Sequence, residues 1–446
     1  MSQTKSTSGF VLESAVINST RQLEPIDVLG LVTDVEIFEH MDLPYITGQV
    51  AIVDTFRLYD RLDFQGAEYF IIKIKQSENS PIIEKRFVID KLMSNKKTNE
   101  QSDLIMFHIV EDTLFNSNLL NVNKMYKGNP FEIITSIANE WLDKAVNFIN
   151  EEVFQKKIKV IIPNLTPFDA MTWIKNRATT TNGFPVYLFS SFTVDDIICA
   201  DLKTLIDGQP INKSAPLIYG ATNHDIEANL QYRLVPIKEY SIGQTDDLYN
   251  LIADGLVGAE HQFIDTHYGE NKKYKFNVDK DSFINILEDN VSNKRVTFAN
   301  DFEFNEKPIQ EYTSRKILKI TQSGAYDDGT NRYRSYAEDI HASDHAKKII
   351  AHSLKKFLLK APITVRIDGA GFIQDESHYT TGNIIRILFT ANRPTGDGTI
   401  KLDLKKSGDY LIYGAKHSFG HTRYNIHLKC VKLTSYTDDN PMKVIG

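Results

Sequence analysis

One pattern of three apolar segments occurs twice in this chain, about 320 residues apart. In each copy a Gly turn precedes an apolar strand, a polar loop follows, and two further strands form a hairpin. The copies comprise residues 66–74, 87–90 and 104–110 on the N-terminal side and residues 382–389, 410–413 and 424–433 on the C-terminal side. A strand-like segment that begins with proline precedes each copy. The repetition predicts a duplicated β domain, although an all-β chain also repeats short apolar runs by necessity.

Length and composition set the broad class. A chain of 446 residues is too long for one ordinary core, so two to four domains are expected. Apolar residues make up 41% and charged residues 24%, which is typical of a soluble globular protein. The 51 basic and 58 acidic residues give a net charge of −7, which argues against a protein that coats nucleic acid. DNA can still pass such a protein, because a negative wall repels phosphates.

The cysteines and the first residues bear on the compartment. Only two cysteines occur, Cys199 and Cys430, which excludes a disulfide framework and indicates folding in a reducing cytoplasm. Residues 1–9 are polar, so they are neither a signal peptide nor a membrane anchor. No segment approaches the roughly 20 apolar residues that cross a bilayer. We therefore expect a soluble protein with no membrane anchor.

Two helix starts mark a change of character after the first strands. Residues 129–132 (Asn-Pro-Phe-Glu) place an N-cap Asn, a first-turn Pro and a Glu three residues after the cap. Residues 166–169 (Thr-Pro-Phe-Asp) repeat the signal, and a strand follows Asn182-Gly183. A small α+β domain is predicted here.

Strand character returns at 216–242, before a polar, Asp/Asn-rich stretch at 243–329 and a helix at 333–359. The strand block at 363–433 has too few strands to close a barrel. We therefore predict that 216–242 pairs with it, which leaves 243–329 as an excursion from that barrel, because long surface insertions cost little loop-closure entropy.

The predicted fold is a β-rich α+β multidomain protein with two tube-type antiparallel β-barrel domains and smaller α+β domains. The expected divisions are a flexible arm at 1–25, a first barrel at 26–115, an α+β domain at 116–215, a second, split barrel at 216–242 and 330–436, an inserted domain at 243–329 and a tail at 437–446.

Catalytic and metal-binding patterns are weak. His341, His345 and His352 share one face of the predicted helix, but the general-base Glu that follows the first His in zinc peptidases is missing, so a solvated polar face is the better interpretation. His417, His421 and His427 flank a hairpin turn, where ordinary polar histidines are common. The sequence contains neither a phosphate-binding Gly-rich loop nor a Gly-x-Ser-x-Gly elbow. We expect no catalytic, cofactor-binding or metal-binding residues.

Four segments, in order, resemble a known family. Residues 54–74 resemble the first barrel of contractile-tail baseplate hub proteins, and residues 166–184 resemble their helix-then-strand unit. Residues 322–326, which lead into a helix, resemble a stretch of the T-even phage hub, and residues 410–428 resemble the closing hairpin that phage hubs share with secretion-spike hubs. The resemblance covers about 26–436, and the chain departs from it by being longer at 243–329.

The resemblance implies a structural hub without enzymatic activity or cofactors, assembled in the host bacterial cytoplasm and located in the virion tail baseplate. Three copies would form a pseudo-six-fold ring that joins the hexameric tail tube to the trimeric spike and lets DNA pass during host entry. Other baseplate proteins and tape-measure proteins are further expected partners. The alternatives are a hub of a secretion-type or bacteriocin-type injection machine and, from another class, a hub-linked cell-wall hydrolase.

Overall fold

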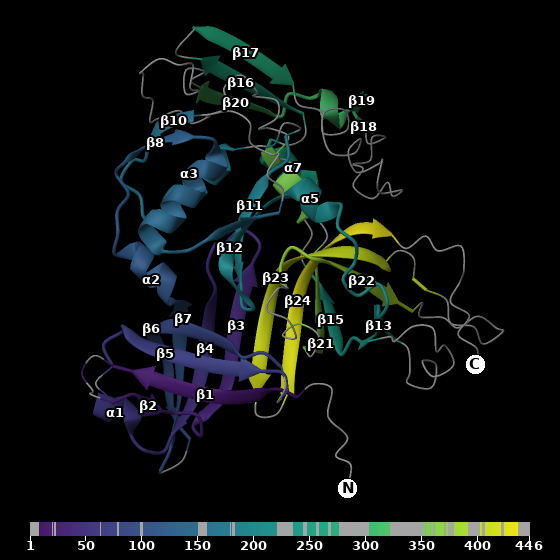
Figure 1. Ribbon diagram of the computed structural model, residues 1–446. Helices are drawn as coiled ribbons and strands as arrows, with labels where there is room; N and C mark the ends of the chain where they lie inside the picture. Colours follow the sequence, from purple (N-terminus) through teal and green to yellow (C-terminus); the bar gives the residue numbers. More distant parts are fainter. Residues whose placement is uncertain are drawn as a thin grey trace, which may run out of the picture.

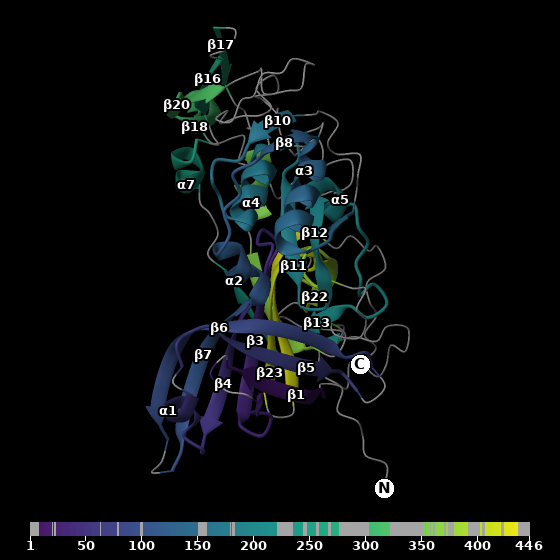
Figure 2. The same ribbon diagram turned by 60° about the vertical axis from the view of Figure 1, so that its left-hand side comes forward.

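The computed structural model describes residues 9–435, and strands dominate it (Figure 1). The longer gaps in the described residues are 150–157, 221–234, 276–302, 322–350, 373–378 and 391–401. The shorter ones are 20, 22–23, 63, 78–79, 99–100, 179, 181–182, 244–247, 256–257, 266–268, 353, 357, 360–361, 370–371, 404–405 and 421–422. A 14-stranded sheet forms the lower part of both views, and the small sheets and the labelled helices other than α1 lie above it (Figures 1 and 2).

The N-terminal half of the large sheet is the first strand block. Its strands are β1 (Val11–Asn18), β2 (Ile26–Asp27), β3 (Val32–His40), β4 (Thr47–Asp54), β5 (Glu68–Lys75), β6 (Ile83–Lys97) and β7 (Asp103–Glu111), with the short helix α1 (Leu58–Leu62) after β4. They are arranged in the order β3-β4-β7-β6-β5-β1-β2, and every neighbouring pair is antiparallel. Buried and half-buried residues alternate along β5, as expected of a strand with one face in the core.

The second strand block comes mostly from the C-terminal part of the chain. Its strands are β13 (Leu217–Tyr219), β14 (Val235–Pro236), β15 (Glu239–Ile242), β21 (Pro362–Asp368), β22 (Ile384–Phe389), β23 (Gly408–Gly420) and β24 (Arg423–Ser435). The pairing that the sequence predicted between 216–242 and the C-terminal strands is present, because β13 pairs with β22 and β15 pairs with β21.

The two blocks share one strand order. The second block is arranged as β15-β21-β24-β23-β22-β13-β14, which matches the first block strand for strand in chain order. The four central strands are antiparallel in both blocks. In the second block, however, β13 pairs parallel with β22 and with β14. Gly66 before β5 and Gly382 before β22 both have positive φ, 76° and 88°. Both turns therefore use the left-handed conformation that glycine adopts without strain. The repeated sequence pattern thus corresponds to a repeated topology.

The blocks are joined edge to edge through an antiparallel pairing of β23 with β3, which makes one continuous sheet. Among the described residues no strand pairing closes either block on itself. The prediction of a β-rich chain is confirmed, while two closed barrels remain a proposal.

The prediction of a flexible arm over residues 1–25 is wrong for Val11–Asn18. These residues form β1, which pairs antiparallel with β5 and buries Ala15 and Ile17 in the core. The physical reason is that Ala15 and Ile17 lie two residues apart in an apolar run, so in a strand both project from one face into the core. Residues 1–8 and 436–446, with the predicted tail, lie outside the described residues.

The α+β region follows the first block and packs around its own core. Its elements are α2 (Asp112–Asn118), β8 (Met125–Gly128), α3 (Pro130–Ile137), a π-helical turn (Ala138–Leu142), β9 (Val146–Phe148), β10 (Ile158–Ile161), α4 (Pro167–Arg177), β11 (Val186–Ser191), β12 (Val194–Asp201) and α5 (Leu202–Ile206). Both predicted helix starts are confirmed. Asn129 and Glu132 form a reciprocal capping box on α3, and the Thr166 hydroxyl accepts a hydrogen bond from the Asp169 N–H on α4.

The excursion between β15 and β21 contains a separate small sheet, seen at the top of Figure 1. Helix α7 (Leu248–Ala253) precedes β16 (Ala259–Asp265), which pairs with β17 (Glu270–Lys275) and with β20 (Arg315–Thr321). A two-stranded sheet of β18 (Glu303–Phe304) and β19 (Lys307–Pro308) and a 3-10 turn (Ile309–Glu311) precede β20. In the first block the corresponding connection, between β3 and β4, is only residues 41–46.

The hydrophobic cores follow these divisions with one exception. A single core runs through both strand blocks, and the α+β region has its own. The third cluster covers the outer face of the second block: Ile384, Leu411 and Val431 pack with Leu202 and Leu205 of the α+β region and with Leu354 and Leu358. The second block is therefore apolar on both faces.

Candidate functional site

The junction between the blocks is the first candidate site. Residues Asp34–His40 of β3 pair antiparallel with Gly414–Gly420 of β23, with His417 opposite Ile37. A half-buried ion pair of 2.9 Å joins Lys416 to Glu36 across the same strands. The junction is thus a run of backbone hydrogen bonds that link the two halves of the duplication.

A fully buried carboxylate lies behind this pairing. Glu39 Oε1 accepts hydrogen bonds from the Phe192 N–H at 2.6 Å and from the Ser191 hydroxyl at 3.0 Å. His417 Nε2 lies 3.0 Å from the same oxygen, and the Thr381 hydroxyl lies 3.4 Å from Oε2. Glu39 therefore ties together the first block, the second block and the end of β11 in the α+β region.

His417 extends the network into the core of the second block. Its Nδ1 lies 2.7 Å from the Tyr424 hydroxyl, and both side chains are buried. The rings of Tyr424 and Phe419 stack with centroids 4.5 Å apart, and Phe192 packs against Phe419 at 5.7 Å. Every hydrogen-bonding atom of the imidazole has a partner, which a buried polar group requires.

The surroundings decide the charge of this network. Burial alone raises the pKa of Glu39, but the nearby His417 and the hydrogen bonds from His417, Phe192 and Ser191 outweigh burial and hold that pKa below its ordinary value of 4.5. Burial first, and the Glu39 charge second, raise the pKa of Tyr424 well above 10.0. The carboxylate is therefore stable as a buried anion only because the three regions meet around it.

Ser191, His417 and Glu39 are the residue types of a hydrolase triad, but their arrangement differs from one. The Ser191 hydroxyl and His417 Nε2 both contact the same carboxylate, so the imidazole is not placed to take the Ser191 proton. All three side chains are buried, away from any substrate. This geometry holds elements together and does not activate a nucleophile.

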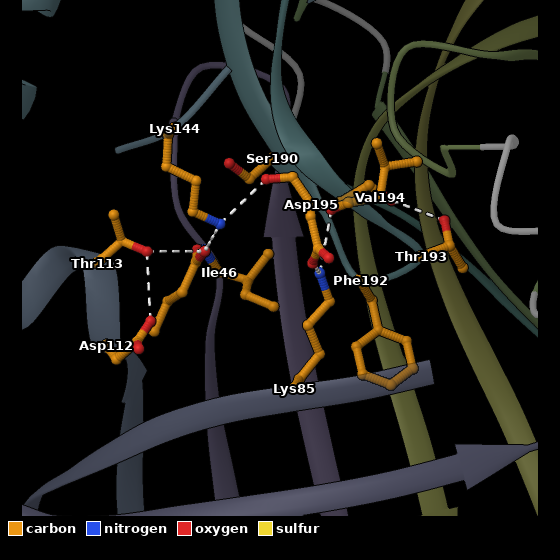
Figure 3. Close-up of polar contacts among 12 residues, drawn as sticks. Ile46, Lys85, Asp112, Thr113, Lys144, Ser190, Phe192, Thr193, Val194 and Asp195 are labelled. Carbon is orange, nitrogen blue, oxygen red and sulfur yellow. Dashed lines mark hydrogen bonds and ion pairs between the residues drawn. The ribbon is translucent and has the colours of Figure 1, made fainter. Parts of the chain in front are cut away.

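A second polar contact joins the α+β region to β6 and β7 (Figure 3). The Lys85 ammonium lies 2.5 Å from the Asp195 carboxylate and 3.1 Å from the Val194 carbonyl. Lys144 donates to Glu111 and to the Asp195 carbonyl, each at 3.0 Å. A pocket of about 290 Å³ beside these residues is lined by Ile82, Ile83, Glu84, Lys85, Thr193, Val194, Asp195 and Asp196.

The electrostatics of this contact favour its charged form. Burial raises the pKa of Asp195, but the hydrogen bond from Lys85 and the charges of Lys85 and Lys144 lower it overall. Burial lowers the pKa of Lys144, but Glu111 outweighs burial and raises it overall. The pocket therefore lies beside an occupied ion pair.

The structure describes three of the histidines singled out in the sequence, His352, His417 and His427. His341, His345 and His421 lie outside the described residues, while His352 is in a described helical turn. His417 corrects the interpretation that the hairpin histidines are ordinary polar residues, because it is buried in the junction. Burial, and then the positive charges of Lys416 and Arg366, lower the pKa of His427. Within the described residues no cluster of His, Cys, Asp and Glu could hold a metal.

Sequence reasoning missed Glu39 because its hydrogen-bonding partners lie far away along the chain. Its partner His417 lies 378 residues away, and the hydrogen-bonding Ser191 lies 152 residues away. One signal was available: Glu39 lies in an alternating apolar strand, next to the polar link that turns into β4. Both cysteines are buried and free, and burial raises the pKa of each thiol. Among the described helices, none has the length and apolar character needed to span a bilayer.

Comparisons with known proteins identify the fold. No family model and no curated protein matches this sequence. A tail protein from Neisseria meningitidis MC58 has a similar structure with a TM-score of 0.50 and 12% identity, over 95% of this chain and 97% of that one. The 43 kDa tail protein of prophage MuSo2 from Shewanella oneidensis gives 0.53 and 8%, over 94% of this chain and 99% of that one.

A third similar structure, with a TM-score of 0.42 and 7% identity, is an E. coli component of the type VI secretion system, over 97% of this chain and 78% of that one. The fold of this chain is that of phage tail proteins, along nearly its whole length. This fold agrees with the resemblance to baseplate hub proteins that the sequence shows.

Proposed function

We propose that this protein is the structural central hub of a contractile phage tail baseplate, without catalytic activity. In this proposal it forms a homotrimeric, pseudo-six-fold ring between the hexameric tail tube and the trimeric spike, and DNA passes through the lumen during host entry. The protein is then a virion component, assembled in the cytoplasm of the host bacterium.

The observation that carries the proposal is the repeated strand order. One chain holds the order β3-β4-β7-β6-β5-β1-β2 and its counterpart β15-β21-β24-β23-β22-β13-β14, joined by β3 and β23. Three such chains present six similar blocks, which suits a protein that must match a six-fold tube on one face and a three-fold spike on the other. In this proposal each block is a tube-type barrel, completed in the assembled ring.

The composition and the junction support a structural role. The net charge of −7 suits a channel through which DNA moves without binding. The carboxylate with the most hydrogen-bonding partners in the junction, Glu39, is buried and serves three parts of the fold at once. The small cavity in the contact between the α+β region and β6 is lined by the ion pair of Lys85 with Asp195.

The proposal is tested by the mass and shape of the purified protein, with and without the spike that the same phage genome encodes. Mass photometry and negative-stain images should show three-chain rings in at least one of the two samples. A strictly monomeric protein in both samples contradicts the hub. Peptidoglycan clearing by the purified protein would instead favour a hub-linked hydrolase.

A further inference from the structure

Part of strand β6 has an open edge. Its first half, Ile83–Ile89, pairs with β5, and from Phe87 onward β6 also pairs with β7, whereas Lys91–Lys97 pairs with β7 only. Among the described residues no other strand pairs with this segment. Its side chains are exposed except for the half-buried Ser94. An edge that presents unpaired N–H and C=O groups can accept another strand.

The counterpart of this segment in the second block is occupied. By strand order β6 corresponds to β23, and both strands contain a β-bulge directly before the segment, between Ile89 and Lys91 in β6 and between Ile412 and Gly414 in β23. Strand β6 has one more bulge inside the segment, between Leu92 and Ser94. After the bulge, β23 runs from Gly414 to Gly420 and pairs with β3 on the edge that is open in β6. The same structural position is thus filled in one block and bare in the other.

The counterpart of β3 is also bare. Strand β15 corresponds to β3, and it pairs with β21 alone within the described residues. Its last residue, Ile242, is 59% exposed, although it is apolar and lies in a sheet. On β6, Leu92 and Met93 are 37% and 44% exposed. Residues 91–97 of β6 and strand β15 are therefore two open edges with exposed apolar side chains. They correspond to the two strands, β23 and β3, that pair within the chain.

We propose that residues 91–97 of β6 pair antiparallel with β15 of a second copy of this chain, repeating between chains the contact that β23 and β3 make within one. This inference rests on the proposed function for the number of copies, and the strand pairing itself rests on the repeated topology. A head-to-tail contact of this kind forms a ring when its rotation closes. The lysines at 91, 96 and 97 deter indiscriminate pairing of an open edge, so a matching partner is needed.

The repeated topology also fixes the register. In the first block Ile37 pairs with Gly48, which pairs with Ile109 of β7. In the second block Ile242 pairs with Ile363, which pairs with Cys430 of β24. Ile37 and Ile242 are therefore corresponding residues. Ile109 pairs with Ile89 and Cys430 pairs with Ile412, and Ile89 and Ile412 are the last residues before the bulge that precedes each segment.

Counting from the bulges along β7 and β24 makes Asn95 the counterpart of His417, since their partners are Ile105 and Ile426. His417 lies opposite Ile37. Asn95 of one copy should therefore lie opposite Ile242 of the next.

Disulfide trapping tests this register. Asn95→Cys protein is mixed with Ile242→Cys protein and oxidised, and non-reducing gels should show a linked species of two chains. Each variant oxidised alone is the control and should stay at one chain. The native thiols of Cys199 and Cys430 are buried, so they do not compete. The double variant should give linked species up to the full ring.

A substitution on the edge gives an independent measurement. Met93→Lys should shift the protein from ring to monomer and raise the concentration of half-dissociation at least tenfold. Met125→Lys is the matched control, because Met125 is 41% exposed on β8, outside the large sheet. It should leave the ring unchanged.

The outcomes separate the two proposals. A three-chain ring that neither cross-links at these positions nor weakens with Met93→Lys overturns the edge pairing and leaves the hub intact. A cross-linked assembly whose copy number is not three supports the edge pairing and contradicts the trimeric hub. A monomer with no cross-link, with and without spike, overturns both.

Discussion

The two strand blocks have the same strand order but different surroundings. In the first block the outward side chains of β5, such as Ile71, are half-buried, and the last half of β6 has an open edge. In the second block the outward Ile384 and Leu388 of β22 are fully covered, and the edge of β23 holds β3. Strand order and register therefore do not depend on what covers the outer face. The covering differs because Leu202 and Leu205 of the α+β region, with Leu354 and Leu358, pack on the outer face of the second block.

The largest expected loss of stability comes from a substitution in the junction that joins the blocks. Glu39→Ala should lower the free energy of unfolding by about 3–5 kcal/mol, because it leaves His417 and the Phe192 N–H without their buried anion. Urea denaturation followed by circular dichroism measures the loss.

Glu36→Ala is the control for this change, since Glu36 forms an ion pair with Lys416 across the same two strands but is half-buried. It should cost about 0–1 kcal/mol. Equal losses in the two variants would show that the buried network does not hold the blocks together.

A second comparison concerns the outer faces. Ile384→Ala should cost about 2–5 kcal/mol, because its side chain is buried in the third core cluster. Ile71→Ala, on the outward face of the corresponding strand β5, should cost roughly 1 kcal/mol because that side chain is half-buried. The midpoints of urea unfolding measure both, and a larger loss at Ile71 would reverse the comparison.

The junction should also respond to acid. The pKa of Glu39 in the folded protein lies below its ordinary value of 4.5, so its contribution to stability is present above pH 4.5 and is lost as pH falls through the folded pKa. The slope from this one group is at most about 1.4 kcal/mol per pH unit. Unfolding free energies from pH 6 down to pH 3 measure it. Glu39→Gln should show a shallower acid dependence than the native protein, and identical slopes would contradict the assignment.

The smallest expected effect concerns the contact between the α+β region and β6. Lys85→Ala should cost about 1 kcal/mol, because Lys85 is buried while its partner Asp195 is exposed and screened by solvent. Lys73→Ala removes an exposed pair with Glu84 one strand away and should cost close to nothing. Thermal unfolding of the two variants distinguishes them. Equal midpoints would mean that the contact of Lys85 with Asp195 (Figure 3) does not stabilise the fold.

Much of the fold could be predicted because short sequence patterns determine its turns and helix starts. The paired Gly66 and Gly382 turns and the cap residues Asn129 and Thr166 act within a few residues of themselves. The pairing of β15 with β21 followed from counting strands. Strand β1 was missed because its apolar face is short, with Ala15 and Ile17 as the buried residues. The Glu39–His417 network could not be found, since its members meet only after the whole chain has folded.

The distance along the chain between β3 and β23 has a consequence for folding. The junction pairs residues about 380 positions apart, so His417 is synthesised long after β3. Contacts so remote form slowly because the chain must search a large volume first. During translation the first block can assemble long before its edge partner leaves the ribosome. Until β23 is synthesised, the edge of β3 has no partner strand within its own chain, and neighbouring nascent chains are the molecules best placed to pair with it.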